Sequence, residues 1–169
     1  GVSMVTEDRL MTGIISILSV RENMSLANLP SYCNKLKFVQ TAREEREVDK
    51  MVERMNVKLS TPAQPIGSLS GGNQQKAILG KWLLTKPNVL ILDEPTRGID
   101  VGAKYEIYSL IAKLAAEGMA VILISSELPE VIGLSDRIIV MRGRRIVGEI
   151  SAKDATEEKL LSMAMMEET

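Results

Sequence analysis

The chain has 169 residues, 45% of them hydrophobic, which is enough to fill the core of one domain. Lysine and arginine total 21 against 22 aspartate and glutamate, so the net charge of −1 leaves no basic excess for a nucleic-acid partner. The single cysteine, Cys33, excludes an internal disulfide, and the longest apolar stretches, such as residues 120–124, are too short to span a bilayer.

The first predicted elements are a strand over residues 2–6 and a helix that begins after Ser19. Glu22 follows Ser19 by three residues, which is the capping-box pattern, in which each side chain bonds the other residue's backbone N–H. Pro30 lacks a backbone N–H and clashes with a preceding helical turn, so the predicted helix ends before it.

A second helix is predicted from Thr41, where Glu44 repeats the capping-box pattern. Apolar side chains then recur at the spacing i, i+3, i+4 and i+7, which places them on one face of a helix. These side chains are Val48, Met51, Val52 and Met55. A third helix is predicted to begin at Ser70 and to stop near Pro87.

In the second half of the chain, predicted strands alternate with predicted helices. Short apolar strands over residues 89–92 and 120–124 flank an amphipathic helix over residues 104–116. This alternation predicts βαβ units, and therefore an α/β fold with a parallel sheet. Residues 136–141 and 145–150, separated by a glycine-containing turn, predict a hairpin at the edge of that sheet.

The sequence LSGGNQQK, residues 69–76, places two glycines in the first turn of the third predicted helix. The first backbone N–H groups of a helix are unpaired, its dipole is positive there, and glycine leaves room for a phosphate to approach closely. Ser70, Gly71 and Gly72 therefore suit an anion. Taken alone, a Ser-Gly-Gly would more simply be a helix N-cap after a turn.

The sequence VLILDEPT, residues 89–96, is an apolar strand that ends in two carboxylates. Open α/β sheets bind ligands at the carboxyl ends of their strands, so Asp93 and Glu94 are candidates for binding Mg²⁺ and for activating a water molecule. Asp-Glu-Pro is also a common turn composition. The four apolar residues before it and Thr96 after it favour the metal and base roles.

Together, residues 69–76 and 89–96 resemble the signature motif and the Walker B strand of ABC transporter ATPases. The Asn-Gln-Gln after the glycines and the sequence DEPTRGIDVGAK, residues 93–104, look like the monosaccharide-importer branch of that family. Three further sequences fall in the order expected of the second half of one nucleotide-binding domain. They are VTEDR at residues 5–9, ISSELPE at residues 124–130 and DRIIVMRGRRIVGEI at residues 136–150.

A Walker A loop, which cradles the phosphates of ATP, is not found in the chain. It needs two glycines at a fixed spacing followed by lysine, and residues 67–72 and 143–148 have the spacing but are followed by Asn73 and Glu149. We therefore expect this chain to be a carboxyl-terminal fragment of the second nucleotide-binding domain of an importer ATPase. The isolated fragment is expected to be inactive.

The resemblance implies four segments. Residues 1–18 would form a core strand and the Q-loop region, and residues 19–86 a helical subdomain that carries the signature motif. Residues 87–150 would form the Walker B strand and the later half of the parallel-sheet core. Residues 151–169 would form a C-terminal helix.

The resemblance also implies the roles of individual residues. ABC ATPases work as head-to-tail pairs, in which the signature helix of one domain acts on ATP held by the other. The residues expected to contact that ATP in trans are Ser70, Gly71, Gly72, Gln74 and Asp100, of which Asp100 could equally be a helix cap. In the domain's own site, Asp93 would hold Mg²⁺ through water and Glu94 would orient or deprotonate the attacking water.

Two positions depart from the family pattern. Ser126 stands where most ABC ATPases have a switch histidine, and the chain contains no histidine. Glu7 stands where a glutamine usually couples metal, water and permease, and its carboxylate would add negative charge beside the phosphates. Both changes predict that the site containing Asp93 and Glu94 is impaired, while the signature helix is intact.

The resemblance finally implies the partners of the whole protein. It predicts a second ABC ATPase domain in the same polypeptide, a membrane permease that faces residues 20–66, and a periplasmic sugar-binding protein that acts indirectly. It also predicts a peripheral position on the cytoplasmic face of the membrane. Two other functions remain open: a non-transport ABC ATPase in translation or DNA repair, and a nucleotide-binding regulatory module without turnover.

Overall fold

The computed structural model describes residues 1–165 of the chain. These residues belong to two compact units, residues 1–122 and residues 123–169, and each unit is described by itself. The last four residues of the predicted C-terminal segment, 166–169, lie outside the described part.

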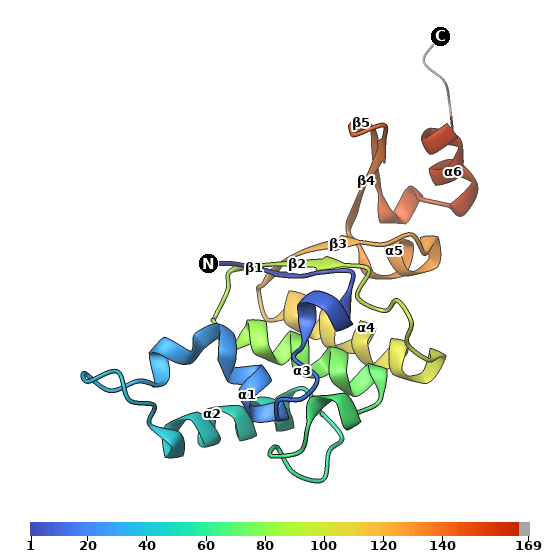
Figure 1. Ribbon diagram of the computed structural model, residues 1–169. Helices are drawn as coiled ribbons and strands as arrows, with labels where there is room; N and C mark the ends of the chain where they lie inside the picture. Colours follow the sequence, from blue (N-terminus) through green and yellow to red (C-terminus); the bar gives the residue numbers. More distant parts are fainter. Residues whose placement is uncertain (166–169) are drawn as a thin grey trace. The chain divides into compact units, whose positions relative to one another are not determined.

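A sheet with the strand order β1-β2-β3 forms the frame of the first unit (Figure 1). Its strands are β1 (Val2–Val5), β2 (Val89–Asp93) and β3 (Ala120–Ile124). Strands β1 and β2 run parallel, with Val2 opposite Val89 and Val5 opposite Leu92. The prediction of an α/β fold with a parallel sheet is confirmed.

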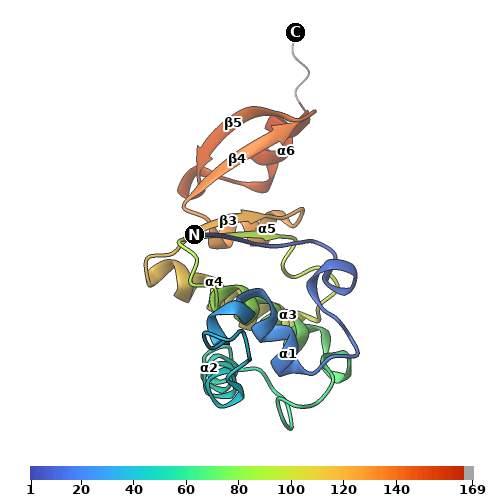
Figure 2. The ribbon, with the colours of Figure 1, turned by 60° about the vertical axis from the view of Figure 1, so that its left-hand side comes forward.

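Two helices, α3 (Gly71–Leu83) and α4 (Val101–Ala116), cover one face of β1 and β2, as Figures 1 and 2 show. The strands bury alternate side chains on this face, so that Val5, Leu90 and Leu92 are at most 1% exposed. Side chains on the opposite face of β1, such as Val2, remain exposed. The alternation of burial follows from the two-residue period of a strand.

A helical segment packs on the other side of α3 (Figure 2). It contains α1 (Val20–Ser25), a 3₁₀ helix (Leu26–Tyr32) and α2 (Thr41–Arg54). The capping box of Ser19 and Glu22 is confirmed. The α-helix ends at Ser25, earlier than predicted, and Pro30 lies inside the 3₁₀ helix that follows.

The second predicted capping box is wrong, although the helix itself is confirmed. The N-cap of α2 is Gln40, and Thr41 is already helical. Glu44 is buried and accepts a hydrogen bond from the hydroxyl of Ser25 on α1. The predicted apolar face is buried as expected at Val48, Met51 and Met55.

The second unit contains a hairpin of β4 (Arg137–Arg142) and β5 (Arg145–Ser151), preceded by α5 (Leu128–Leu134) and followed by α6 (Glu157–Met165). Gly143 and Arg144 form its turn with positive φ angles, the conformation that suits a two-residue hairpin loop. The hairpin forms a two-stranded sheet of its own, so the prediction that it lies at the edge of the parallel sheet is wrong. Helix α6 packs against both strands of the hairpin, and its Met163 lies against Gly148 of β5.

None of the helices in residues 1–165 has the length and apolar character needed to cross a bilayer.

Lys81 is a buried cation in the middle of this fold. It lies near the end of α3 and donates a hydrogen bond to the carbonyl oxygen of Gly13, which follows β1 in the chain. Its ammonium group also lies 5.2 Å from the ring centre of Trp82. Burial lowers the pKa of Lys81 from its usual value of 10.5, because the charged form loses hydration.

The lowered pKa of Lys81 predicts a pH-dependent stability. Between the folded pKa and 10.5 the unfolded chain holds more protons at this group than the folded chain, so the contribution of Lys81 to stability rises with pH. As the pH rises through this range, we expect the unfolding free energy of the natural chain to increase relative to that of Lys81→Met. Urea unfolding of both proteins at a series of alkaline pH values measures it, and a constant difference would contradict it.

Candidate functional site

The first turn of α3 is not capped by its own side chains. Ser70 has the extended backbone of an N-cap, yet its hydroxyl accepts no hydrogen bond from the N–H groups of the helix. The N-caps Ser19 of α1 and Asp100 of α4 do accept such bonds. The amides that begin α3 therefore have no side-chain acceptor from Ser70, which leaves them available to an anion.

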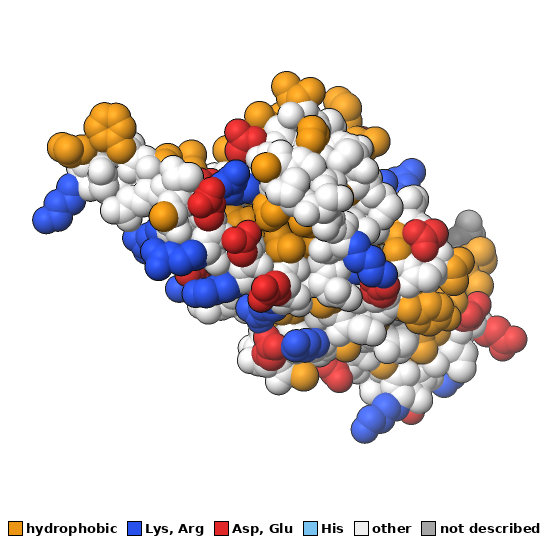
Figure 3. All heavy atoms as spheres, turned by 90° about the horizontal axis from the view of Figure 1, so that it is seen from below, with side chains coloured by type: hydrophobic (Ala, Val, Ile, Leu, Met, Phe, Trp, Pro, Cys, Tyr) orange, Lys and Arg blue, Asp and Glu red, His pale blue; other side chains and the backbone are white. Residues whose placement is uncertain are grey.

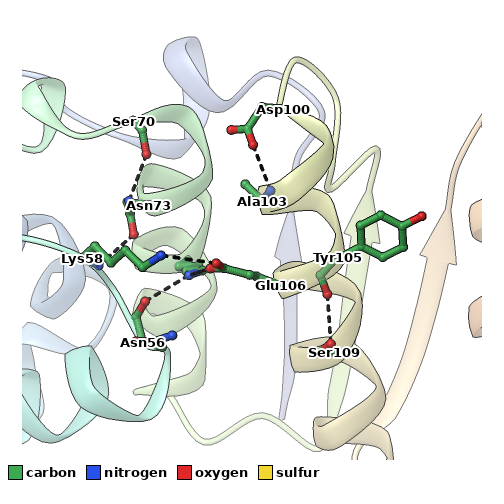
Figure 4. A network of polar contacts seen from close by, with 10 residues as sticks. Asn56, Lys58, Ser70, Asn73, Asp100, Ala103, Tyr105, Glu106 and Ser109 are labelled. Carbon is green, nitrogen blue, oxygen red and sulfur yellow. Dashed lines mark hydrogen bonds and ion pairs between the residues drawn. The ribbon is translucent and has the colours of Figure 1, made fainter.

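The hydroxyl of Ser70 is held instead by Asn73, one helical turn later. The side-chain N–H of Asn73 donates to Ser70 Oγ over 2.9 Å, and the backbone N–H of Lys58 donates to Asn73 Oδ1 over 2.8 Å (Figure 4). Asn73 thus uses both ends of its amide to join the start of α3 to the chain that follows α2.

A hollow of about 320 Å³ lies between the first turns of α3 and α4. Three of the predicted site residues line it, namely Ser70, Gly72 and Asp100. Its other lining residues are Lys58, Asn73, Lys76, Gly102, Ala103 and Glu106. The structure therefore brings together residues from the later part of the sequence DEPTRGIDVGAK and from the LSGGNQQK sequence, whereas Asp93 and Glu94 do not line this hollow.

The close approach of the two helices depends on Gly72. A Cβ atom at this position would lie 2.5 Å from the Cβ of Ala103 on α4, closer than two carbon atoms can pack. One turn further along, Lys76 forms an ion pair with Glu106 across the same interface. The hydrogen bond and the charge of Lys76 lower the pKa of the Glu106 carboxyl below its usual 4.5.

Gly71 has a different environment from Gly72. A Cβ atom at this position would lie 3.1 Å from a terminal nitrogen of Arg9, the flexible end of a long side chain. The guanidinium group thus stands beside the positive end of the α3 dipole, where a cation is unfavourable and an anion is favoured. This pairing of a cation with a helix N-terminus adds to the case for an anion at Ser70 and Gly71.

Gln74 does not point toward this hollow. It is buried, and its side-chain N–H groups donate to the carbonyl oxygens of Leu69 and Ile66. The polar side chain beside Ser70 is that of Asn73, which sequence reasoning did not select. Its position three residues after the N-cap, where a side chain can reach back to the cap, was the available signal.

Asp93 and Glu94 stand at the carboxyl end of β2, as predicted. Asp93 is the last residue of the strand, and both residues are half-buried. Glu94 has φ +47°, a left-handed conformation that is uncommon for a residue with a side chain. Such strained conformations gather at functional sites, where the surrounding structure holds them in place.

Glu7 lies in another hollow, lined by residues 7–10 and Arg97. Its carboxylate forms an ion pair with Arg97, which follows β2 in the sequence. The backbone oxygen of Arg97 in turn accepts a hydrogen bond from Arg9. The charge of Glu7 is therefore balanced by a cation that sequence reasoning did not associate with it.

Ser126 belongs to the second unit, in the loop between β3 and α5, and is exposed. Its neighbour Ser125 donates a hydrogen bond to the buried carboxylate of Glu130 on α5.

The residues present fit a Mg²⁺ ion that is bound mainly by phosphate and water. Within residues 1–165, no three His, Cys, Asp or Glu side chains are grouped closely enough to hold a metal ion. Mg²⁺ is commonly bound by one or two carboxylates together with phosphates and water. Asp93 fits the role of a single protein ligand to a magnesium ion that arrives with phosphate.

The chain matches the model of the ABC transporter family over residues 1–97. It is 53% identical over 164 residues to a putative ribose/galactose/methyl galactoside import ATP-binding protein from Pseudomonas syringae pv. syringae, covering 97% of this chain and 31% of the relative. It is 47% identical over 165 residues to a ribose import ATP-binding protein from Clostridium tetani, covering 98% of this chain and 33% of the relative. The chain thus spans about a third of the length of these relatives.

Solved structures share its fold. A dimeric ATP-binding cassette bound to ADP and phosphate matches with a TM-score of 0.74 at 19% identity, covering 89% of this chain and 62% of that one. An inward-facing structure of a putative metal-chelate type ABC transporter matches with a TM-score of 0.79 at 16% identity, covering 96% of this chain and 62% of that one.

The contact of Gly72 with Ala103 yields a test of the site's construction. Gly72→Ala should destabilise the protein by about 1–3 kcal/mol, because the added methyl group forces α3 away from α4. The exchange of the two residues, Gly72→Ala with Ala103→Gly, should restore most of the loss. Urea unfolding measures both variants, and equal stability of the single and double variants would contradict the packing described.

Proposed function

Because the chain belongs to the ABC transporter family, we propose that it forms part of an ATPase that powers the import of a sugar through a membrane permease. The names of its relatives, which are ribose, galactose and xylose import ATP-binding proteins, support a sugar as the cargo. In this proposal the chain is the later part of the second nucleotide-binding domain, in a polypeptide that contains both domains.

The observation that carries the proposal is the open first turn of α3. Ser70, Gly71 and Gly72 would present a hydroxyl and backbone amides to the γ-phosphate of an ATP held by the other domain. Preorganised donors of this kind stabilise the charge that develops during phosphoryl transfer. Asp100 lines the same hollow and would cross to the partner domain while it caps α4.

Asp93 and Glu94 would serve the domain's own ATP. Asp93 would bind Mg²⁺ through a water molecule, and Glu94 would orient or deprotonate the water that attacks the phosphate. The ion pair with Arg97 offsets the charge of Glu7, so the carboxylate would repel phosphate less than the sequence alone suggests. Ser126 still supplies no imidazole, and this site is therefore proposed to be the weaker of the two.

The two sites predict opposite sensitivities to mutation. In a full-length ATPase that contains this chain, Gly71→Asp should abolish most sugar-stimulated hydrolysis, because it puts bulk and negative charge where the phosphate binds. Glu94→Gln should leave a substantial fraction, because a site already weakened at Ser126 has little further to lose. Steady-state ATPase rates with the permease in membranes measure both.

Gly71→Asp has a built-in control for folding. The atoms nearest to an added Cβ are the flexible end of Arg9 and the backbone oxygen of Gly98, 3.6 Å away, so the variant should unfold at nearly the natural temperature. If Glu94→Gln is as inactive as Gly71→Asp, the proposal of a weak own site is wrong. If Gly71→Asp keeps its activity, the proposed role of the signature helix is wrong.

Residues 33–39 support a docking surface for the permease within the segment 20–66. They form a tight loop closed by a bridge between Cys33 and Val39, and the side chain of Asn34 accepts hydrogen bonds from the N–H groups of Leu36 and Phe38. Leu36 and Phe38 are 76% and 70% exposed. Figure 3 shows hydrophobic atoms, with basic atoms beside them, at the tip of this projecting loop. An exposed aromatic side chain on a hydrogen-bonded loop suits an interface anchor.

We expect Phe38→Ser to weaken binding to the permease by about thirtyfold, the loss of one aromatic anchor. Ile146→Ser, which removes an equally exposed apolar side chain outside segment 20–66, is the control and should bind as the natural protein does. Titration of the ATPase onto permease in nanodiscs measures both affinities. Equal affinity of the Phe38 and Ile146 variants would contradict the proposed docking surface.

A further inference from the structure

We propose that Asn73 is a positioning residue, which orients the hydroxyl of Ser70 so that it can donate to a bound phosphate. The inference rests on the proposed function of Ser70. It concerns six residues that we call the Ser70 network: Asn56, Lys58, Ser70, Asn73, Lys76 and Glu106.

The direction of the hydrogen bonds carries the first step. Asn73 Oδ1 accepts from the backbone N–H of Lys58, which can only donate. The opposite end of the amide, its NH₂ group, is therefore the end that meets Ser70, and it donates to the hydroxyl oxygen. Ser70 Oγ accepts this bond, so its own proton is directed elsewhere and is not consumed by Asn73.

The same bond keeps Ser70 from closing its own helix. An N-cap serine ordinarily turns its oxygen toward the backbone N–H groups of the first turn, as Ser19 does at α1. Ser70 makes no such bond, because its oxygen faces the side chain of Asn73. Asn73 thus keeps both the hydroxyl proton and the first amides of α3 available for a ligand.

Charged residues fix the segment to which Asn73 is anchored. Lys76 has a side chain only 2% exposed, and its ammonium donates to the backbone oxygen of Asn56 over 3.0 Å and pairs with Glu106. Glu106 also pairs with the ammonium of Lys58 over 3.4 Å (Figure 4). The segment 56–58 is therefore held from both sides, and its Lys58 amide is the donor that sets the orientation of Asn73.

A double-mutant cycle tests whether Asn73 acts through Ser70. In the full-length protein with its permease, Asn73→Ala should lower the kcat of sugar-stimulated ATP hydrolysis about tenfold with little change in KM, because the oriented hydroxyl acts in the transition state. Ser70→Ala should lower it at least as much. The double variant should match Ser70→Ala, because the hydroxyl to be oriented is gone. A further tenfold loss in the double variant would overturn the inference.

Hydrogen exchange tests the same network without nucleotide or activity. The amide of Lys58 should exchange about tenfold faster in Asn73→Ala, which removes its acceptor, and about threefold faster in Glu106→Gln. Glu117→Gln is the matched control. Glu117 lies at the other end of α4, is as exposed as Glu106 (42% and 41% of the side chain), and pairs with Arg54 of α2, but has no link to Asn73. Equal exchange at Lys58 in all four proteins would overturn the inference.

The outcomes separate this inference from the proposed function. If Ser70→Ala retains full activity, the proposed role of Ser70 fails, and the positioning role fails with it. If Ser70→Ala is impaired while Asn73→Ala is not, only the positioning role is overturned. Thermal unfolding of each variant shows whether a loss of kcat accompanies a loss of fold. If a variant is unfolded at the assay temperature, the comparison of hydrogen exchange in Glu106→Gln and Glu117→Gln decides the inference in place of its kinetics.

Discussion

Helix α3 carries a constraint on which the first unit depends: it must be buried along most of its length and open at its first turn. Its middle residues, such as Ile78 and Leu79, are at most 2% exposed and lie between the sheet and the helical segment. Because the helix is buried on most sides, its position depends partly on close contacts at glycine, where Gly72 lies against Ala103 and Gly80 lies against Met24.

Two buried lysines on α3 hold the helix in a fixed orientation through their hydrogen bonds and one ion pair. A buried ammonium group must be paired or hydrogen-bonded, because desolvation of an isolated charge is costly. Lys76 satisfies this requirement with Glu106 and the carbonyl oxygen of Asn56, and Lys81 with the carbonyl oxygen of Gly13. The helix is thereby tied at one end to α4 and at the other to the chain that follows β1. Movement of either neighbour would therefore also move Ser70, Gly71 and Gly72 at the first turn of α3.

Local patterns predicted the elements well and their polar details poorly. The strands and α2 to α4 follow from hydrophobic periodicity, which depends only on which residues can be buried. The sequences from Ser19 to Glu22 and from Thr41 to Glu44 have the same capping pattern, but Glu44 bonds Ser25 of α1, a partner distant in sequence. The prediction of Gln74 rather than Asn73 as a site residue failed for the same reason. The side chain of Gln74 is turned inward by its bond to the carbonyl oxygen of Leu69, and that of Asn73 is held beside Ser70 by the backbone N–H of Lys58. The order of residues in the sequence does not reveal these partners. The division into four segments remains a prediction.

Charge balance bears on the proposal that Glu7 stands where the family usually has glutamine. A glutamine at that position would be neutral, whereas a glutamate brings a negative charge toward the proposed phosphate site. Arg97 pairs with Glu7, and Arg9 bonds the backbone of Arg97 and stands beside Gly71. Arg9 and Arg97 therefore place two guanidinium groups in the hollow that also holds the carboxylates of Glu7 and Asp8, and Arg9 extends from there to the first turn of α3. The cation that pairs with Glu7 lies ninety residues away in the sequence, in the loop that follows the carboxylates of β2, so the sequence alone does not reveal the pairing.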